Sequence, residues 1–319
     1  MRRVTGLVAA ALGMFLIVLA VLTRFYIAAQ VVKFPLDENS VTTLTASNAS
    51  YFSTGLLQSV RGASMTDTST TQGDVAAGTA HTAVWNNFSY VFDNTNQQTY
   101  SYSLRRLAFD RRSGALVNCC GAAIDGKKVR AAGLGYVWPL NAKKQTYEVF
   151  DSTLMKPEPA SFAGTASIDG LTTYKYVENI TPTQFATQTL PGSLVGLAGQ
   201  PTVQLGEFYA GTTTDWVDPT TGAPVQVALS QHLYLAGSSG SSVLNLLDAT
   251  FTSTPASVAA LVSTAKSYDA KISVITLIVP VTGAVAGVII LLIGIILGRQ
   301  PRGYEYVDEA AQDLAGAPG

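Results

Sequence analysis

The sequence contains few of the residues on which most enzymes and nucleic-acid-binding proteins depend. Charged residues make up 13% of the 319 residues and the formal net charge is −1, which argues against a nucleic-acid partner. The only histidines, His81 and His232, are too few for a histidine metal site. Motifs of serine hydrolases, zinc peptidases and phosphate-binding loops are missing. Carboxylates such as Glu148, Asp151 and Glu158 can pair in space, but their spacing does not show it. We therefore expect no enzyme, no catalytic residue, no metal and no cofactor.

Cysteine is equally scarce, and the only two residues, Cys119 and Cys120, are neighbours. Outside the cytoplasm thiols usually oxidise, and these two have no other partner in the chain. Neighbouring Cα atoms lie about 3.8 Å apart, less than the roughly 4.4 Å usual for a disulfide. A bond between them would therefore fix a tight turn. Its role stays open between locking that turn, lining a ligand surface, and redox or intermolecular chemistry.

Two long apolar runs, Val4 to Thr23 and Ile272 to Gly298, contain no ionisable side chain. A helix rises about 1.5 Å per residue, so roughly 20 residues cross a hydrocarbon core of about 30 Å. The sequence between them is patterned like β-strands. We therefore expect an α+β membrane protein, with a β-rich extracytoplasmic domain between N- and C-terminal transmembrane helices.

The charges that flank the two runs predict the orientation. Arg2 and Arg3 precede the first run, and Arg299 and Arg302 follow the second, so both termini should be cytoplasmic in a two-pass protein of the cell membrane. The alternative is a cleaved signal peptide ending near Ile27-Ala28-Ala29, but the run is longer than a typical signal core of about 7–15 residues. The expected parts are a cytoplasmic N-terminus (1–3), a transmembrane helix (4–23), the β-rich domain (24–254), a stalk helix (255–271), a second transmembrane helix (272–298) and a cytoplasmic tail (299–319).

Small residues in the second run lie on one stripe of a helix. Small residues allow helix backbones to approach closely within lipid. We expect this stripe to pack against the first run, which has small residues at seven-residue spacing, or against a second copy of the chain. The stripe consists of Gly283, Gly287, Gly294 and Gly298, and the first run offers Gly6, Gly13 and Ala20.

Alternation and turn signals predict strands in the central region. His81–Asp93 and Gln97–Asp110 resemble a hairpin joined through Asn94-Thr95-Asn96. Thr254-Pro255 is typical of a helix start. Further strands are expected at 171–177, 203–209, 225–235 and 243–251, a mobile loop at 62–78, and a helical or irregular stretch at 182–199.

One turn pattern, Asp-x-x-[Ser/Thr]-Gly-Ala-x-Val, occurs twice, at Asp110–Val117 and Asp218–Val225. The Asp side chain caps such a turn and the Gly adopts a left-handed conformation. The repetition indicates either two duplicated half-sheets or two hairpins that use the same favourable turn.

Most of the positive charge of the central region is concentrated in one stretch. It is a candidate site for anionic headgroups or for a phosphate on a lipid-linked sugar. The alternative is a solvated face. Alternation along the strands would divide these side chains between two faces of the sheet. The residues are Arg105, Arg106, Arg111, Arg112, Lys127, Lys128 and Arg130.

The stretches DRRSGALVNCCG, GLGYVWPLNAKKQTYEVFDSTLMKP and SIDGLTTYKY follow one another between Asp110 and Tyr176. The second contains Trp138-Pro139, a basic pair, Thr146-Tyr147 and Phe150-Asp151. Together they resemble the actinobacterial porin PorA-like family, long described as a domain of unknown function. The resemblance implies a two-span protein of the cell envelope and brings no catalytic residue with it.

Three functions are compatible with this layout. The chain binds or hands on a lipid or lipoglycan intermediate in envelope assembly, as the topology of two-anchor lipid receptors of the scavenger-receptor type suggests; this is the function we favour from the sequence. The alternatives are a non-catalytic scaffold for envelope biosynthesis proteins and an oligomeric, porin-like channel. Two helices per chain cannot enclose an aqueous path, so a channel would require a homo-oligomer.

Overall fold

A computed structural model describes residues 2–197, 199–237 and 241–299, which form two compact units. One unit combines residues 1–31 with 273–319, and the other comprises residues 32–272. Nearly all of the expected cytoplasmic tail lies outside the described residues.

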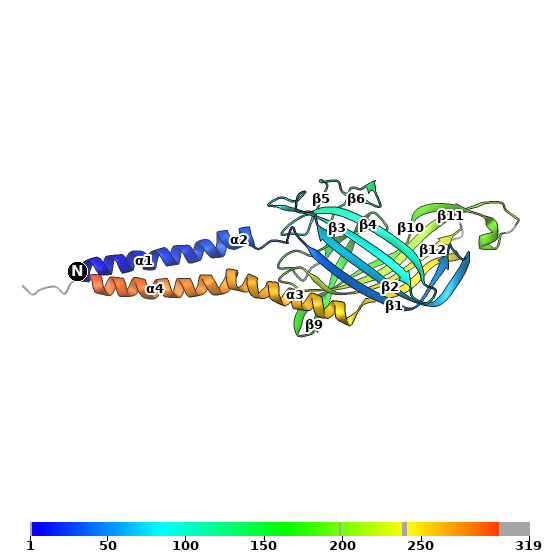
Figure 1. Ribbon diagram of the computed structural model, residues 1–319. Helices are drawn as coiled ribbons and strands as arrows, with labels where there is room; N and C mark the ends of the chain where they lie inside the picture. Colours follow the sequence, from blue (N-terminus) through cyan, green and yellow to red (C-terminus); the bar gives the residue numbers. More distant parts are fainter. Residues whose placement is uncertain (1, 198, 238–240, 300–319) are drawn as a thin grey trace, which may run out of the picture. The chain divides into compact units, whose positions relative to one another are not determined.

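The described residues of the first unit are mainly helical. The N-terminal part contains α1 (Arg2–Leu22), the π-helical turn η1 (Thr23–Ile27) and α2 (Ala28–Val31). The C-terminal part contains the π-helical turn η3 (Val274–Ile278) and α4 (Val279–Gly298). Two helical stretches, Val4–Val31 and Pro255–Gly298, are long and apolar enough to cross a membrane. Helices α1 and α4 lie side by side (Figure 1).

Glycines set the close approach of α1 and α4. A Cβ atom placed on Gly13 would lie 2.6 Å from the carbonyl oxygen of Gly287, and one on Gly287 would lie 2.8 Å from the carbonyl oxygen of Gly13. A Cβ atom on Gly6 would lie 2.7 Å from the backbone nitrogen of Gly298. Any larger residue at these positions would force the two backbones apart, so the small residues of both helices face each other within one chain.

The second unit is built on a 13-stranded antiparallel sheet. Its strand order among the described residues is β7-β6-β4-β3-β2-β1-β13-β12-β11-β10-β9-β8, with β5 beside β4. Together with the terminal apolar helices, this sheet confirms the predicted fold class. The strands are β1 (Asn39–Ser53), β2 (Gln58–Gly73), β3 (Thr82–Asp93), β4 (Gln98–Asp110), β5 (Leu116–Val117), β6 (Ala123–Ile124), β7 (Lys127–Lys128), β8 (Tyr147–Asp151), β9 (Lys156–Ile168), β10 (Leu171–Leu190), β11 (Val203–Val217), β12 (Pro224–Ala236) and β13 (Ser242–Ser253).

The sheet closes on itself through one residue, Leu134. Ala115, next to β5, pairs with Leu134, and Leu134 pairs in parallel with Val149 of β8. The Leu134 N–H donates to the Glu148 carbonyl and the Leu134 carbonyl accepts from the Phe150 N–H, both at 2.8 Å. This links β4 and β5 to β8 and completes a ring of hydrogen-bonded neighbours. Figure 1 shows the strands wrapping around rather than lying flat.

Contacts across the ring agree with this closure. The Tyr100 hydroxyl on β4 donates to the Leu246 carbonyl on β13 at 3.2 Å, although these strands are not neighbours. The rings of Tyr51 on β1 and Tyr100 lie 5.3 Å apart. The ring therefore has an inward face, on which side chains from opposite strands meet, and an outward face.

Two local predictions are wrong. Most of the expected mobile loop at 62–78 is part of strand β2, and the expected helical or irregular stretch at 182–199 belongs to strand β10 up to Leu190, followed by the short 3-10 helix η2 (Gly192–Val195). The Ser/Thr content of β2 resembles a loop, but threonine is β-branched and favours an extended backbone. Thr66, Thr68 and Thr70 alternate with the inward-facing residues of that strand.

Helix α3 (Pro255–Ser273) begins where the sequence predicted. The Thr254 hydroxyl accepts a hydrogen bond from the Ser257 N–H at 3.2 Å and caps the helix. Val258, Val262 and Ala265 pack against Leu171 and Val225, so this helix covers part of the sheet.

Candidate functional site

The inward face of the ring has an apolar part and a polar part. The apolar part lies on β1, β2 and β13 and includes the buried side chains Ala46, Tyr51, Met65, Leu247 and Phe251. The polar part lies on β2–β4 and on β8–β11, where apolar side chains such as Trp85 and Tyr176 are buried on the same face. The buried polar groups of this part need hydrogen-bond partners, because an unpaired polar group costs stability.

On β2–β4 the polar part is an ordered hydrogen-bond network around Asn87. The Asn87 amide nitrogen donates to the hydroxyls of Ser69 at 2.7 Å and Thr71 at 2.9 Å. The Asn87 carbonyl oxygen accepts from the Arg105 guanidinium at 2.8 Å. Arg105 also lies over the ring of Tyr136, 5.6 Å from its centroid. These contacts hold one positive charge on the inward face.

On β8–β11 the polar part consists of carboxylates. Glu178 of β10 pairs with Thr213 of β11 and with Ala160 of β9. Side chains two residues apart on a strand share a face, so Glu158 on β9 and Asp215 on β11 point to the same side as Glu178. Asp151 ends β8, beside β9.

The surroundings of Glu178, Asp215 and Asp151 raise the pKa values of these three groups. Burial and then the negative charges of Asp151 and Asp215 raise the pKa of Glu178 to about 8. Burial raises the pKa of Asp215 to about 7. The pKa of Asp151 is also raised by burial, while two backbone N–H groups and the charge of Arg105 act against that shift. Part of this carboxylate group is therefore protonated at neutral pH.

One carboxylate oxygen of this group has no hydrogen-bond partner. Glu178 is only 6% exposed, and its Oε1 atom makes no hydrogen bond within the described structure. Buried polar atoms are normally paired. An unpartnered oxygen at this position marks the place where the inward face is ready to accept a donor.

The predicted basic site is divided between the two faces and the turns of the ring. Arg105 points inward, whereas Arg106 forms an ion pair with Asp74 at 2.8 Å. The Arg111 guanidinium donates to the Phe34 carbonyl at 2.7 Å. Four of the seven are exposed, and their binding of anionic headgroups stays a prediction; they are Arg112, Lys127, Lys128 and Arg130.

Cys119 and Cys120 form a disulfide between adjacent residues. Cys120 and the following Gly121 both have positive φ, 61° and 79°. The Cys120 carbonyl accepts a hydrogen bond from the Arg106 guanidinium at 3.1 Å. The pair thus holds a turn beside β4 on which Arg106 is anchored.

The two copies of the repeated turn hold the segment that resembles the PorA-like motif. In both, the Gly N–H donates to the Asp carbonyl, at 3.0 Å for Gly114 and 2.9 Å for Gly222. The Leu140 N–H donates to the Arg112 carbonyl at 2.9 Å, and the Trp138 N–H to the Gly222 carbonyl at 2.8 Å. The segment around Trp138 and Leu140 is therefore hydrogen-bonded to both turns. It follows directly after Leu134, the residue that closes the ring.

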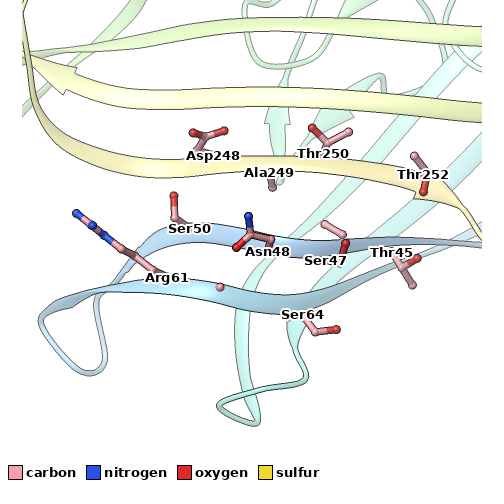
Figure 2. A pocket seen from close by; sticks show the side chains of 12 residues that line it. Thr45, Ser47, Asn48, Ser50, Arg61, Ser64, Asp248, Ala249, Thr250 and Thr252 are labelled. Carbon is pink, nitrogen blue, oxygen red and sulfur yellow. The ribbon is translucent and has the colours of Figure 1, made fainter.

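A separate groove of about 830 Å³ lies on the outward face, over β1, β2 and β13. Figure 2 shows hydroxyl side chains from three strands, with Arg61 and Asp248, along it. Asn48 has a φ of 78° and the pairing register of β1 shifts around it, which bends the strand. The polar side chains of this groove are exposed or half-buried, so it is a hydrated surface.

The sequence did not identify the inward carboxylates as one group. It indicated Asp151 and Glu158 only as scattered acids, and it gave no signal for Glu178 or Asp215. Alternation along β10 and β11 could have placed these two on a common face, but only the strand order brings them together. Within the described residues, no three His, Cys, Asp or Glu side chains are arranged to hold a metal ion.

The fold and the site together define a class of membrane-anchored proteins with a closed antiparallel sheet and a partly polar interior. The family model described as Porin PorA matches residues 5–296, so the chain belongs to the porin PorA family. This confirms the resemblance found in the sequence. A comparison with curated proteins finds no match.

Proposed function

We propose that this protein provides a porin-like passage for small hydrophilic solutes, with the polar part of the inward face as its path. The observation that carries the proposal is the closure of the sheet at Leu134 around side chains such as Arg105, Asp151 and Glu178. Charged side chains inside a closed sheet lower the stability of a packed core, but they can line a path for polar solutes. Membership of a family described as porins agrees with this function.

The membrane part of the passage requires several copies of the chain. A membrane-spanning barrel presents an apolar band to lipid, whereas the outward side chains of this ring include Thr66, Thr68, Thr250 and Thr252. The apolar helices are therefore the membrane-spanning elements, and two helices per chain are too few to surround water. A homo-oligomer follows from this function, with both termini in the cytoplasm as the flanking arginines predict.

The lipid-carrier function that the sequence favoured has less support than the passage. Its binding site would be the apolar part of the inward face. There Tyr51 is 2% exposed, Phe251 is 2% exposed and Met65 is fully buried, and they pack against one another in one cluster. These side chains fill the space that an acyl chain would occupy.

The passage is tested by comparing two cysteine variants whose side chains lie on opposite faces of β11. The full chain is reconstituted into planar bilayers, and cysteine is introduced at Thr213, which points inward, or at Thr214, which points outward on the same strand. The native cysteines are bonded to each other and leave no free thiol. A charged thiol reagent should reduce the conductance of Thr213→Cys by about half or more and leave Thr214→Cys unchanged.

Two results would contradict the passage. Bilayers that stay silent with the folded wild-type chain would remove it, and so would equal block at both positions. If silent bilayers were accompanied by a stoichiometric lipid in organic extracts of the purified chain, the carrier function would replace it. Recovery of envelope enzymes by crosslinking, without lipid or conductance, would favour the scaffold.

A further inference from the structure

The carboxylates on the inward face are not all balanced by positive charge. Glu158 forms an ion pair with Lys156 at 2.7 Å. Asp151 lies within the electrostatic reach of Arg105. Among the described residues, Glu178 and Asp215 have no such cationic neighbour. The ring therefore carries a buried and a half-buried carboxyl group on adjacent strands without a counter-charge.

The geometry around Glu178 matches a donor that carries positive charge. Its Oε1 atom is buried and unpartnered. Thr213 lies opposite it on β11, and Asp215 lies at the diagonal position, where Cα atoms are typically about 7–8 Å apart. Tyr209, which is 1% exposed, lies further along the same face. The pairing register thus places several oxygen acceptors on one face, as a group with several N–H donors requires.

The chemistry of this oxygen set selects an ammonium group. A divalent metal ion needs several carboxylates or imidazoles close together, and the described residues contain no such group. A primary ammonium has three donors on one charged nitrogen. It would satisfy the unpartnered oxygen of Glu178 and take the place of the proton that neutralises this carboxyl group.

We propose that Glu178 and Asp215 form a binding site for the primary ammonium group of a small organic cation inside the ring. This site rests on the proposed passage and names the class of solute that it selects. Because the pKa of Glu178 is raised to about 8, this carboxyl group is largely protonated at neutral pH. Binding of an ammonium group therefore releases a proton, since the cation stabilises the ionised carboxylate. The charged groups that bear on this exchange are Asp151, Glu158, Lys156, Asp215 and Arg105.

The test measures binding and proton release by the full chain in detergent, without a bilayer. n-Butylammonium is titrated by calorimetry at pH 7 in buffers of different ionisation enthalpy, which reports the number of protons released. Tetramethylammonium, which has the charge but no N–H donor, is the matched probe. We expect saturable binding of n-butylammonium with proton release, and binding of tetramethylammonium weaker by about tenfold or more, because a charge-assisted hydrogen bond is lost.

Two variants locate the site. Glu178→Gln should weaken n-butylammonium binding by about tenfold or more and abolish proton release. Glu207→Gln, which changes a half-buried carboxyl elsewhere on β11, should leave both unchanged. Circular dichroism confirms that each variant is folded, and Asp215→Asn replaces Glu178→Gln if that variant does not fold.

The outcomes separate this site from the passage. Absence of saturable binding, equal binding of both cations, or full binding by folded Glu178→Gln would overturn the ammonium site, whatever the conductance. Saturable binding of n-butylammonium by a chain that gives no conductance in bilayers would overturn the passage. The ammonium site would then be that of a binding protein.

Discussion

Two buried carboxyl groups on the inward face, Asp93 and Glu178, have opposite properties. Asp93 is fully buried and accepts hydrogen bonds from the Tyr51 hydroxyl at 2.6 Å, the Asn96 amide at 2.7 Å and the Thr95 N–H at 2.8 Å. Burial acts to raise its pKa, but these donors prevail and the pKa lies below its usual value. Glu178 is almost as buried, has an unpartnered oxygen, and its pKa is raised to about 8 by burial and nearby carboxylates.

The difference shows that donors, rather than burial, decide the role of a buried acid. Asp93 ends β3 beside the apolar part of the inward face, where it closes a turn and supports the fold. Glu178 lies among carboxyl groups, and the one donor that acts to lower its pKa, the Thr213 side chain, does not offset burial and these negative charges. The first is a structural residue, and the second is available to a ligand or to a proton.

The largest effect should follow from removing Asp93. Asp93→Ala leaves the Tyr51 hydroxyl and the turn amides of Thr95 and Asn96 without their acceptor. We expect the free energy of unfolding to fall by about 3 kcal/mol or more. Thermal unfolding of the purified chain, followed by circular dichroism, measures this loss. Asp93→Asn keeps an acceptor and should recover part of it; an Asp93→Ala variant as stable as wild type would show that these bonds contribute nothing.

The closure that creates the inward face depends on Gly133. This residue has a φ of 84°, and a Cβ atom on it would lie 2.6 Å from the Glu148 carbonyl oxygen. We expect Gly133→Ala to destabilise the chain by about 2 kcal/mol, from backbone strain and displacement of β8.

Gly126 provides the matched control for this glycine. Its φ is 76°, but nothing lies within 4 Å of an added Cβ atom. Gly126→Ala should therefore cost only the backbone strain, about 1 kcal/mol. Equal losses in the two variants, measured by the same unfolding experiment, would show that the contact with β8 does not contribute.

Glu178 should make the protein less stable as the pH rises. The folded pKa of about 8 lies above the unfolded value of about 4.3, so the folded state binds more protons between these two values. Stability therefore falls as the pH rises through this window and levels off above it. Glu178→Gln should reduce the decline, part of which Asp215 and Asp151 also cause, and gain on the order of 2 kcal/mol at pH 9, with little change at pH 4. Parallel unfolding curves of both proteins across this range would contradict the assignment.

The smallest effect should come from Tyr51→Phe, which removes one donor from Asp93 and leaves the others. We expect a loss of about 1 kcal/mol in the free energy of unfolding and an upward shift in the pKa of Asp93. Carboxyl chemical shifts measured during an NMR titration report that pKa. Gln98 also donates to the Tyr51 hydroxyl at 2.6 Å, so Gln98→Ala is the control that perturbs the tyrosine without removing the Asp93 donor. A pKa of Asp93 that does not move in Tyr51→Phe would refute the role of this donor.

Strong local signals were read correctly from the sequence. The hairpin of β3 (Thr82–Asp93) and β4 (Gln98–Asp110) was predicted to within one residue at each end, because its aromatic content and polar turn agree with each other. The helix start at Pro255 was also predicted, since a threonine cap and a proline act locally. Strand β2 was missed because its serines and threonines, taken one by one, are equally common in loops.

The candidate site was far less predictable than these elements. Asp151, Glu178 and Asp215 belong to three different strands, and nothing in their sequence spacing records which strands are neighbours. The basic stretch was visible in the sequence. In the structure, however, Arg105 points inward from β4, whereas Lys127 and Lys128 are exposed. Charge density along a chain does not determine charge density on a surface.

The sequence by itself determined the membrane helices, the β-rich class and the family, because apolar length, residue alternation and turn chemistry are properties of short segments. The tertiary structure decided that the sheet closes at Leu134, that glycines of α1 and α4 face each other, and that Glu178 lies buried beside Asp215. Each of these depends on contacts between residues far apart in the chain. The free energy of a buried charge depends on its neighbours in space, so only the folded ring shows which carboxyl group is left without a partner.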